Sequence, residues 1–344
     1  MRMSQGLSLR KIKVAFGGVA HFHSESYARA IRELPDASIS AVYDQEEKRG
    51  RRFARQYGIK YFSNFDSLLS TDIDAVVITS ETAEHHDLAR KAARAGKNIL
   101  CEKPIAINVK QATSMIKTAQ EHKIVFQMCH VMRFHSTSIL VKSFLDEGRI
   151  GELRAAVGTN KLKSSLPLSA RWFTNRRLSG GGAVIDHSVH LTDLITWFSG
   201  SRVKEVYTEI GRNLNTKLKV EDNFLTTLTL EDGVVAHIDG SWSFSEGYPS
   251  WGDFKLDLTG TEGFVQLNAF EQNLSYSGMK PPTDKLSLQY YGCDADKEMV
   301  ASFIKCVASN LQPVATGSDG LEALKVAIAS YESARKGAVV RIEN

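Results

Sequence analysis

Short apolar runs alternate with helix-like segments along the first third of the chain. Between residues 11 and 129 the segments separating these runs carry apolar positions at helical spacing. An alternation of strands and helices predicts a parallel, doubly wound sheet with helices on its faces. The predicted strands are residues 13–16, 39–43, 75–79, 98–101 and 124–128.

From about residue 150 the pattern changes to longer strands in which apolar and polar residues alternate. The turns Glu231-Asp232-Gly233 and Gly260-Thr261-Glu262-Gly263 join consecutive strands, as hairpins require, and predict an antiparallel sheet. Two late helices are expected before a last strand. The predicted elements are strands 153–161, 203–211, 223–230, 234–243, 254–259 and 263–267, helices 295–310 and 319–336, and strand 338–342.

The chain of 344 residues exceeds the usual size of a single core. We therefore predict two domains, residues 1–129 and residues 130–344. Ligands of a parallel sheet bind outside the carboxyl ends of its strands. The polar or small residues at these ends are Gly17-Gly18, Asp44, Thr79-Ser80 and Glu102-Lys103, so four strand ends should converge on one crevice.

The turn after the first strand partly matches a dinucleotide fingerprint. With Gly18 as the first glycine, the pattern would have glycines where Ala20 and His23 stand. A small residue such as Ala20 still lets backbone amides and a helix N-terminus approach a pyrophosphate. Gly18, Ala20, His21 and Phe22 are thus candidate cofactor contacts, with an ordinary strand-to-helix turn as the alternative.

Asp44 ends the second strand 26 residues after Gly18. A carboxylate in this place binds the ribose hydroxyls of NAD and repels the 2′-phosphate of NADP. No arginine follows Asp44 immediately, which also favours NAD, although Lys48 and Arg49 lie a turn further on. The alternative role for Asp44 is to cap the next helix, and the two roles can coexist.

Asp186 and His190 are four residues apart in a segment with apolar residues at helical spacing, so they should share a helix face. A carboxylate beside an imidazole sets its tautomer and stabilises its charged form, and an imidazole exchanges protons near neutral pH. The pair is a candidate acid/base unit, with helix capping and a core histidine as alternatives. His187 is a competing base, but adjacent helix positions diverge by about 100 degrees.

Composition and charge narrow the classes of function. The formal net charge of +4 comes from basic residues scattered among acids, which gives no reason to expect nucleic acid as a partner. The four cysteines form no C-x-x-C pair, and three lie in apolar surroundings, which predicts buried thiols in a reducing compartment and no metal site. Residues 1–11 lack an apolar signal region and no run approaches eighteen apolar residues. We expect a cytoplasmic protein without a membrane partner.

The chain resembles the Gfo/Idh/MocA family of nicotinamide-dependent oxidoreductases over essentially its whole length. Glu102-Lys103-Pro104 together with the Asp186/His190 pair is the most specific part of the resemblance. The other matching motifs are the first turn, Asp44, His85, Ala95-Gly96-Lys97, Gly148-Arg149-Ile150-Gly151, Trp172, Gly180-Gly181-Gly182 and Thr259-Gly260-Thr261-Glu262-Gly263.

The resemblance implies an N-terminal Rossmann domain and a C-terminal α/β domain with an open, mostly antiparallel sheet. It implies hydride transfer between NAD and a secondary alcohol or ketone of a sugar, cyclitol or related polyol, in a homo-oligomer, dimer or tetramer. Lys103 would be the active-site lysine that touches both the nicotinamide ribose and the reacting oxygen. Asp186 and His190 would bind substrate and transfer the proton.

The resemblance also implies a set of binding residues. Arg133 matches a common family arginine and is a candidate for substrate contact, with a structural ion pair as the alternative. Trp172 and His187 are the other substrate-binding candidates. The cofactor-binding candidates are Gly18, Ala20, His21, Phe22, Asp44, Ser80, Thr82, His85, Glu102 and Lys103.

The sequence departs from the family at three places. Glu81-Thr82 stands where a Pro-Asn pair is frequent, Phe173 where many members have arginine, and His187 where the residue is usually small or apolar. The last suggests an altered substrate pocket. Two rival functions remain, a glycoside-cleaving or eliminating enzyme that oxidises its substrate transiently, and a non-enzymatic NAD-sensing regulator. An intact set of Lys103, Asp186 and His190 argues against the regulator.

Overall fold

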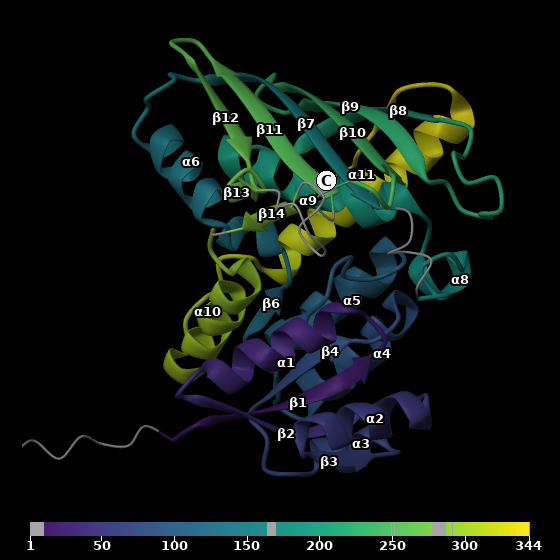
Figure 1. Cartoon of the computed structure of the whole chain (residues 1–344), viewed down its shortest axis with the longest axis vertical. Helices are drawn as coiled ribbons and strands as arrows, with labels where there is room; N and C mark the ends of the chain where they lie inside the picture. Colours follow the sequence, from purple (N-terminus) through teal and green to yellow (C-terminus); the bar gives the residue numbers. More distant parts are fainter. Residues whose placement is uncertain are drawn as a thin grey trace, which may run out of the picture.

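Six parallel strands form the sheet of the first part of the chain in the computed structural model, which describes residues 10–163, 170–248, 250, 252–276, 287–290 and 292–343 (Figure 1). Their order is β3-β2-β1-β4-β5-β6. The central strand β4 is buried at every residue. The strands are β1 (Ile12–Val19), β2 (Ala37–Tyr43), β3 (Lys60–Phe62), β4 (Ala75–Thr79), β5 (Asn98–Cys101) and β6 (Phe126–Met128).

The doubly wound parallel sheet predicted from the sequence is confirmed. Strand β3 was not predicted, because it has only three residues, none of them buried, and so lacks an apolar run. The covering helices are α1 (His23–Glu33), α2 (Glu47–Tyr57), α3 (Phe65–Leu69), α4 (Thr82–Arg94) and α5 (Val109–Glu121).

A second sheet of seven strands follows in the order β12-β11-β7-β10-β9-β8-β15. Neighbouring strands are antiparallel except β7 and β10, so the predicted mostly antiparallel sheet is confirmed. Its strands are β7 (Leu153–Lys163), β8 (Val203–Ile210), β9 (Asn223–Leu230), β10 (Val235–Phe244), β11 (Gly252–Gly260), β12 (Phe264–Asn268) and β15 (Val340–Arg341).

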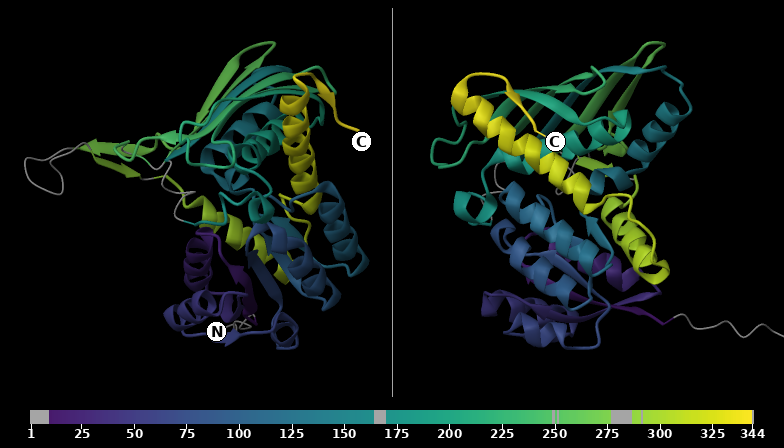
Figure 2. Two further views of the ribbon diagram at one scale, coloured as in Figure 1. Left: turned by 90° about the vertical axis from the view of Figure 1, so that its right-hand side faces the viewer. Right: turned by 180° about the vertical axis from the view of Figure 1, so that it is seen from behind.

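Helices α9 (Ala183–Ser199) and α11 (Gly317–Lys336) pack on one face of this sheet (Figure 1). Strand β9 alternates accordingly, with Phe224 and Leu228 buried and Leu225 exposed. The hairpin of β13 (Asn273–Tyr276) and β14 (Ser287–Tyr290) projects away from both sheets (Figure 2). The remaining elements are η1 (Val131–Phe134), α6 (Ser136–Asp146), α8 (Arg176–Ser179) and α10 (Ala295–Ser309).

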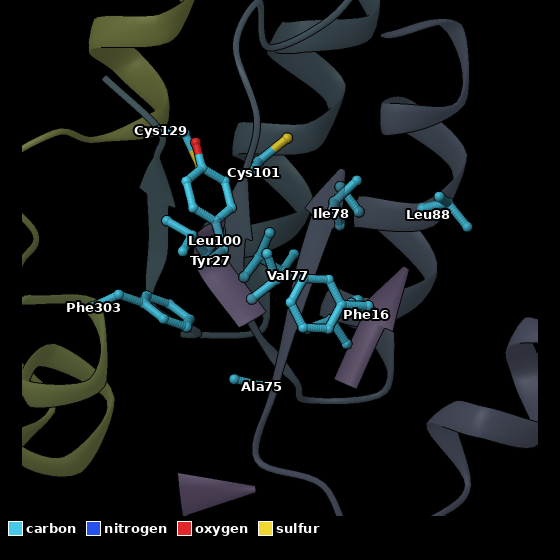
Figure 3. Close-up of a cluster of buried hydrophobic side chains, with 14 of the residues drawn as sticks. Phe16, Tyr27, Ala75, Val77, Ile78, Leu88, Leu100, Cys101, Cys129 and Phe303 are labelled. Atoms are coloured by element: carbon cyan, nitrogen blue, oxygen red, sulfur yellow. The ribbon is translucent and has the colours of Figure 1, made fainter. Parts of the chain in front are cut away.

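The two parts of the chain share a hydrophobic core. Helix α10 packs against α1, and its Phe303 points into the cluster that contains Tyr27 and Leu100 (Figure 3). Phe303 has no exposed surface. The chain therefore returns to the first sheet after building the second, and the boundary at residue 129 stays a prediction.

Close packing fixes the start of α9, the helix that carries Asp186. A Cβ atom on Gly181 would lie 1.8 Å from Tyr331 Oη, and one on Gly182 would lie 2.1 Å from the Glu221 carbonyl oxygen. The Glu221 carboxylate accepts hydrogen bonds from the Gly182 and Val184 amides, at 2.8 and 3.2 Å. The glycines thus let a remote carboxylate cap the helix.

Candidate active site

Lys103 follows strand β5 and reaches the second part of the chain. Its side chain is 6% exposed, and Nζ donates to Asp186 Oδ1 at 2.6 Å and to the Asp186 carbonyl oxygen at 3.2 Å. The Lys103–Pro104 peptide bond is cis. Two of the three predicted catalytic side chains are therefore in direct contact across the junction between the two parts.

The Asp186 carboxylate is held by two further groups. Trp242 Nε1 donates to Oδ2 at 3.1 Å, and His187 Nε2 lies 3.3 Å from the same oxygen. Burial alone would raise the pKa of Asp186, but the Lys103 ammonium and His187 outweigh burial and hold it well below its ordinary value. Asp186 is thus an anion over the physiological range.

His187 is fixed at both ring nitrogens. Its Nδ1 lies 2.8 Å from the Asn160 carbonyl oxygen, which can only accept, so Nδ1 donates this bond. Its Nε2 faces Asp186, and the side chain is buried. His187 therefore orients the carboxylate and has no ring nitrogen left for a ligand.

The expected contact between Asp186 and His190 is replaced by the one between Asp186 and His187. The expectation compared Cβ directions, whereas an imidazole is long enough to fold back onto its neighbour's carboxylate. His190 Nδ1 is buried and has no hydrogen-bond partner among the described residues. Burial lowers the pKa of His190 well below 6.5, and Lys103 adds to the effect. His190 is accordingly a neutral imidazole at pH 7.

A cavity of about 550 Å³ opens beside His190, between the second sheet and the segments before α6 and α10. Asn160 and Lys161 give it a polar wall, and Leu162 and Phe254 give it an apolar one. Such a volume falls in the range of small-molecule sites. A smaller cavity is lined by Lys103, Asp186, Trp172 and Trp242, among others.

The first turn is packed tightly against the end of strand β4. Gly18 has a φ of +82°, and a Cβ atom there would lie 2.4 Å from the Ser80 Cβ, so only glycine fits. The His21 amide donates to the Thr79 carbonyl oxygen at 2.9 Å. Trp172 Nε1 donates to the Ala20 carbonyl oxygen at 3.2 Å.

Aromatic rings from the second part cover this turn. Phe173 stacks on Trp172 at 4.1 Å between ring centroids and on Phe22 at 5.9 Å. Trp172, predicted to bind substrate, thus contacts the predicted cofactor turn as well as the small cavity beside Lys103. Phe173, which replaces a common family arginine, supplies an apolar surface here.

Asp44 is buried at the end of strand β2, and its carboxylate is already paired with the guanidinium of Arg49. It accepts from the amides of Val19 and Glu46, at 2.8 and 2.7 Å. Arg49 binds both of its oxygens at 2.8 Å and also donates to Glu81 at 3.0 Å. The arginine a turn away is therefore part of the nucleotide end of the crevice. Neither Arg49 nor Glu81 was predicted as a site residue.

His85 and Thr82 lie inside the crevice wall. His85 is 1% exposed, and its two ring nitrogens lie 3.0 and 3.3 Å from the carbonyl oxygens of Pro104 and Ser80. Burial lowers the pKa of His85. The imidazole thus connects the ends of β4 and β5. Thr82 is buried and lines the small cavity beside Lys103.

Arg133 forms a structural ion pair, which favours the alternative to substrate contact. Its guanidinium is bidentate on Asp193, at 2.8 and 2.7 Å, and also donates to Asp319 and to the Val314 carbonyl oxygen. The side chain is 3% exposed. These bonds connect η1 to α9 and to the start of α11, within the second part of the chain.

Glu102, the residue before Lys103, points away from Asp186 toward α1. Tyr27 Oη donates to its Oε2 at 2.6 Å, and His23 Nδ1 lies 3.6 Å from its Oε1. Burial would raise the pKa of Glu102, but His21 and His23 outweigh burial and lower it. Burial lowers the pKa of His21 to about 3.

Sequence reasoning missed several residues that complete these contacts. Trp242, Asn160 and Tyr27 were not predicted as site residues. Each reaches its partner from an element remote in sequence, so no local spacing indicated it. Among the described residues, no helix is long and apolar enough to cross a membrane.

Comparison with known proteins identifies the family. Residues 12–130 match the model of an oxidoreductase family with an NAD-binding Rossmann fold, and residues 139–266 match the GFO/IDH/MocA C-terminal domain. The resemblance seen in the sequence is thereby confirmed.

The similar proteins include two from Bacillus subtilis. An uncharacterized oxidoreductase, YrbE, is 28% identical over 341 residues and covers 96% of each chain. A scyllo-inositol 2-dehydrogenase (NAD(+)) is 25% identical over 96% of this chain and 95% of its own. The structure of scyllo-inositol dehydrogenase from Lactobacillus casei with bound NAD(H) and scyllo-inositol has a TM-score of 0.83, at 22% identity over 97% of this chain and 99% of its own. The chain belongs to the Gfo/Idh/MocA family of oxidoreductases, with an NAD-binding Rossmann domain in its first part.

Proposed function

We propose that the protein is an NAD(H)-dependent dehydrogenase that interconverts a secondary alcohol and a ketone on a sugar, cyclitol or related polyol. The observation that carries this proposal is the Lys103–Asp186 ion pair of 2.6 Å, near the neutral His190 at the wall of the cavity. The names of relatives that act on inositols support the substrate class.

The residues of the crevice suit a dinucleotide. The start of α1, preceded by the small residue Ala20, would face the pyrophosphate. The Asp44 carboxylate would accept hydrogen bonds from ribose hydroxyls in place of those it now receives from Arg49. Ser80, Thr82, Glu102 and Lys103 would complete the cofactor contacts. When bound, NAD accepts or supplies the hydride.

The protein's own groups provide orientation and proton transfer. Lys103, held by Asp186, is placed to donate a hydrogen bond to the substrate oxygen and to polarise it. His190 is neutral, so it can accept the hydroxyl proton during oxidation and return it during reduction. Asp186, held by Trp242 and His187, keeps the lysine in position.

NAD is proposed in preference to NADP, although the contacts of Arg49 reduce the expected margin. The carboxylates of Asp44 and Glu81 repel a 2′-phosphate, while Arg49 lies between them and attracts one. Two carboxylates against one guanidinium favour the nucleotide without the phosphate.

The proposal is tested with a panel of cyclitols, aldoses and glycosides, by following the absorbance of reduced cofactor with each nucleotide. We expect NAD-dependent oxidation of at least one free cyclitol or sugar. Release of a glycoside leaving group at constant total NADH would select the transient-oxidation enzyme instead. Binding of NAD without turnover of any member of the panel would favour the regulator.

We further propose a homo-oligomer, dimer or tetramer, in the cytoplasm. Exposed apolar side chains on the uncovered face of the second sheet support self-association. Val157 on β7 is 51% exposed, Val235 on β10 is 48% exposed and Leu225 on β9 is 46% exposed. These three strands are neighbours in the sheet. Light scattering of the full chain tests this proposal.

A further inference from the structure

Three metal-ligating side chains meet beside the first turn. His21 and His23 come from the turn and the start of α1, and Glu102 follows strand β5. One nitrogen or oxygen atom from each lies within 4.8 Å of the others, the only such group among the described residues. The two imidazole rings are 4.5 Å apart between centroids.

Two of these side chains carry a buried atom that makes no hydrogen bond among the described residues, although His23 Nδ1 lies 3.6 Å from one of them, Glu102 Oε1. His21 Nε2 and Glu102 Oε1 are buried and have no hydrogen-bond partner among the described residues. The residues are 2% and 0% exposed. A buried polar atom left unpaired costs about 1–3 kcal/mol, so a ligand that satisfies both atoms would stabilise the fold.

The surrounding contacts leave these two atoms available. Tyr27 Oη binds the other Glu102 oxygen, Oε2, and lies 3.3 Å from His23 Nδ1, so it orients the carboxylate as outer groups do around metal sites. The His23 amide donates to His21 Nδ1 at 3.2 Å. A metal at His21 Nε2 would move the ring proton to Nδ1 and release this weak contact.

We propose that His21, His23 and Glu102 bind a divalent cation of the Zn²⁺ type. Two imidazoles and one carboxylate form a ligand set used by zinc sites that keep one coordination position open. His23 lines the 550 Å³ cavity, which gives the ion a path of entry and the open position a neighbouring ligand space. No spacing motif indicated this site, because Glu102 is 79 residues from His23, and the sequence predicted no metal site.

The charges near the site are compatible with a cation. The Lys103 ammonium is opposed by its own ion pair with Asp186, and Glu102 adds a negative charge. Asp296 lines the same part of the cavity as His23. A hard cation such as Mg²⁺ is not favoured, since it prefers oxygen ligands.

The test is a metal titration of the full chain, freed of nucleotide and metal, because two of the ligands are also proposed to face the cofactor. We expect one Zn²⁺ per chain by calorimetry, and visible Co²⁺ absorption of the intensity given by four-coordinate sites. His21→Ala, His23→Ala and Glu102→Gln should each weaken Zn²⁺ binding by at least about tenfold, the lower limit seen for groups that only support a ligand.

The matched control is His122→Ala, which removes an exposed histidine and should leave Zn²⁺ affinity unchanged. Each variant is first compared with the native chain by circular dichroism without metal, and His23→Gln replaces any variant that does not fold. Absence of Zn²⁺ binding to the native chain would overturn the proposal. So would equal binding by the His21→Ala/His23→Ala double variant. Neither result depends on dehydrogenase activity.

Discussion

Two carboxylates, the buried Asp44 and the mostly buried Asp186, each hold a basic side chain, but over very different lengths of chain. Arg49 lies five residues from Asp44, across one strand-to-helix turn. Lys103 lies 83 residues from Asp186, across the junction between the two sheets. The first pair can form within the Rossmann domain alone, whereas the second requires both parts of the chain to be docked.

This difference separates cofactor choice from chemistry. Asp44 and Arg49, which set the charge where the nucleotide ribose is proposed to bind, belong to one domain. They can vary without disturbing Lys103 and Asp186. The reacting groups exist as a unit only when α9 has packed beside β5. We therefore expect substitutions at the Lys103–Asp186 pair to affect both turnover and stability, and substitutions at the Asp44–Arg49 pair to affect nucleotide preference.

Lys103→Met should give the largest effect. Turnover should fall by roughly two to four orders of magnitude, the scale for a positioned catalytic group. From the sequence we expect folding to stay nearly intact, but the observed pair adds a cost, because the change leaves the mostly buried Asp186 without its cation. Steady-state kinetics and urea unfolding measure both effects.

The control for this variant is Lys91→Met, which removes an exposed lysine paired with Asp66. It should leave turnover and the unfolding midpoint within experimental error. Retention of more than about half the native rate by Lys103→Met would remove the lysine from the mechanism.

His190→Asn should give the next largest effect, a loss of about a hundredfold in the oxidation rate. A base accepts a proton only when neutral, so the rate rises with pH through the pKa of the base. Since the pKa of His190 lies well below 6.5, this rise should fall in the acid range and the profile should be flat near pH 7. The variant should lose this rise of the rate in the acid range, the acid limb of the profile, but keep its affinity for NAD.

His187→Asn provides the comparison within the same helix. Its imidazole orients Asp186 and faces no ligand, so the variant should be slower than the native enzyme while keeping the acid limb. If the His187 variant lost the limb and the His190 variant kept it, the roles of the two histidines would be reversed.

Local patterns in the sequence predicted the strand ends well. Asp44, Ser80 and Lys103 each follow a strand of the parallel sheet, and such strands must present their carboxyl ends at one edge. The same reasoning could not show that the Asp44 carboxylate is already neutralised. Which donor a buried carboxylate takes depends on side-chain conformations that spacing does not determine.

Contacts between remote segments account for the other differences. Trp242 donates a hydrogen bond to Asp186 from β10. Arg133 forms ion pairs with Asp193 and Asp319, which lie on two different helices. The return of α10 to the first sheet had no signal either, because an amphipathic helix does not reveal which sheet its apolar face will cover.

Arg49→Ala should give the smallest effect, confined to the nucleotide end. Removing the guanidinium leaves the carboxylates of Asp44 and Glu81 to repel a 2′-phosphate, so the ratio of NADP to NAD dissociation constants should rise roughly tenfold, or ~1.4 kcal/mol. Arg51→Ala is the matched control, since Arg51 lies on the same helix but pairs with the exposed Glu47. Fluorescence titration with both reduced nucleotides measures the ratio. Turnover with saturating NAD should be nearly unchanged, because the Lys103–Asp186 pair does not include Arg49. An unchanged ratio in Arg49→Ala would mean that Arg49 only stabilises the turn after β2. A loss of turnover would mean that the Asp44–Arg49 pair influences the Lys103–Asp186 pair, so that nucleotide preference and catalysis are not independent.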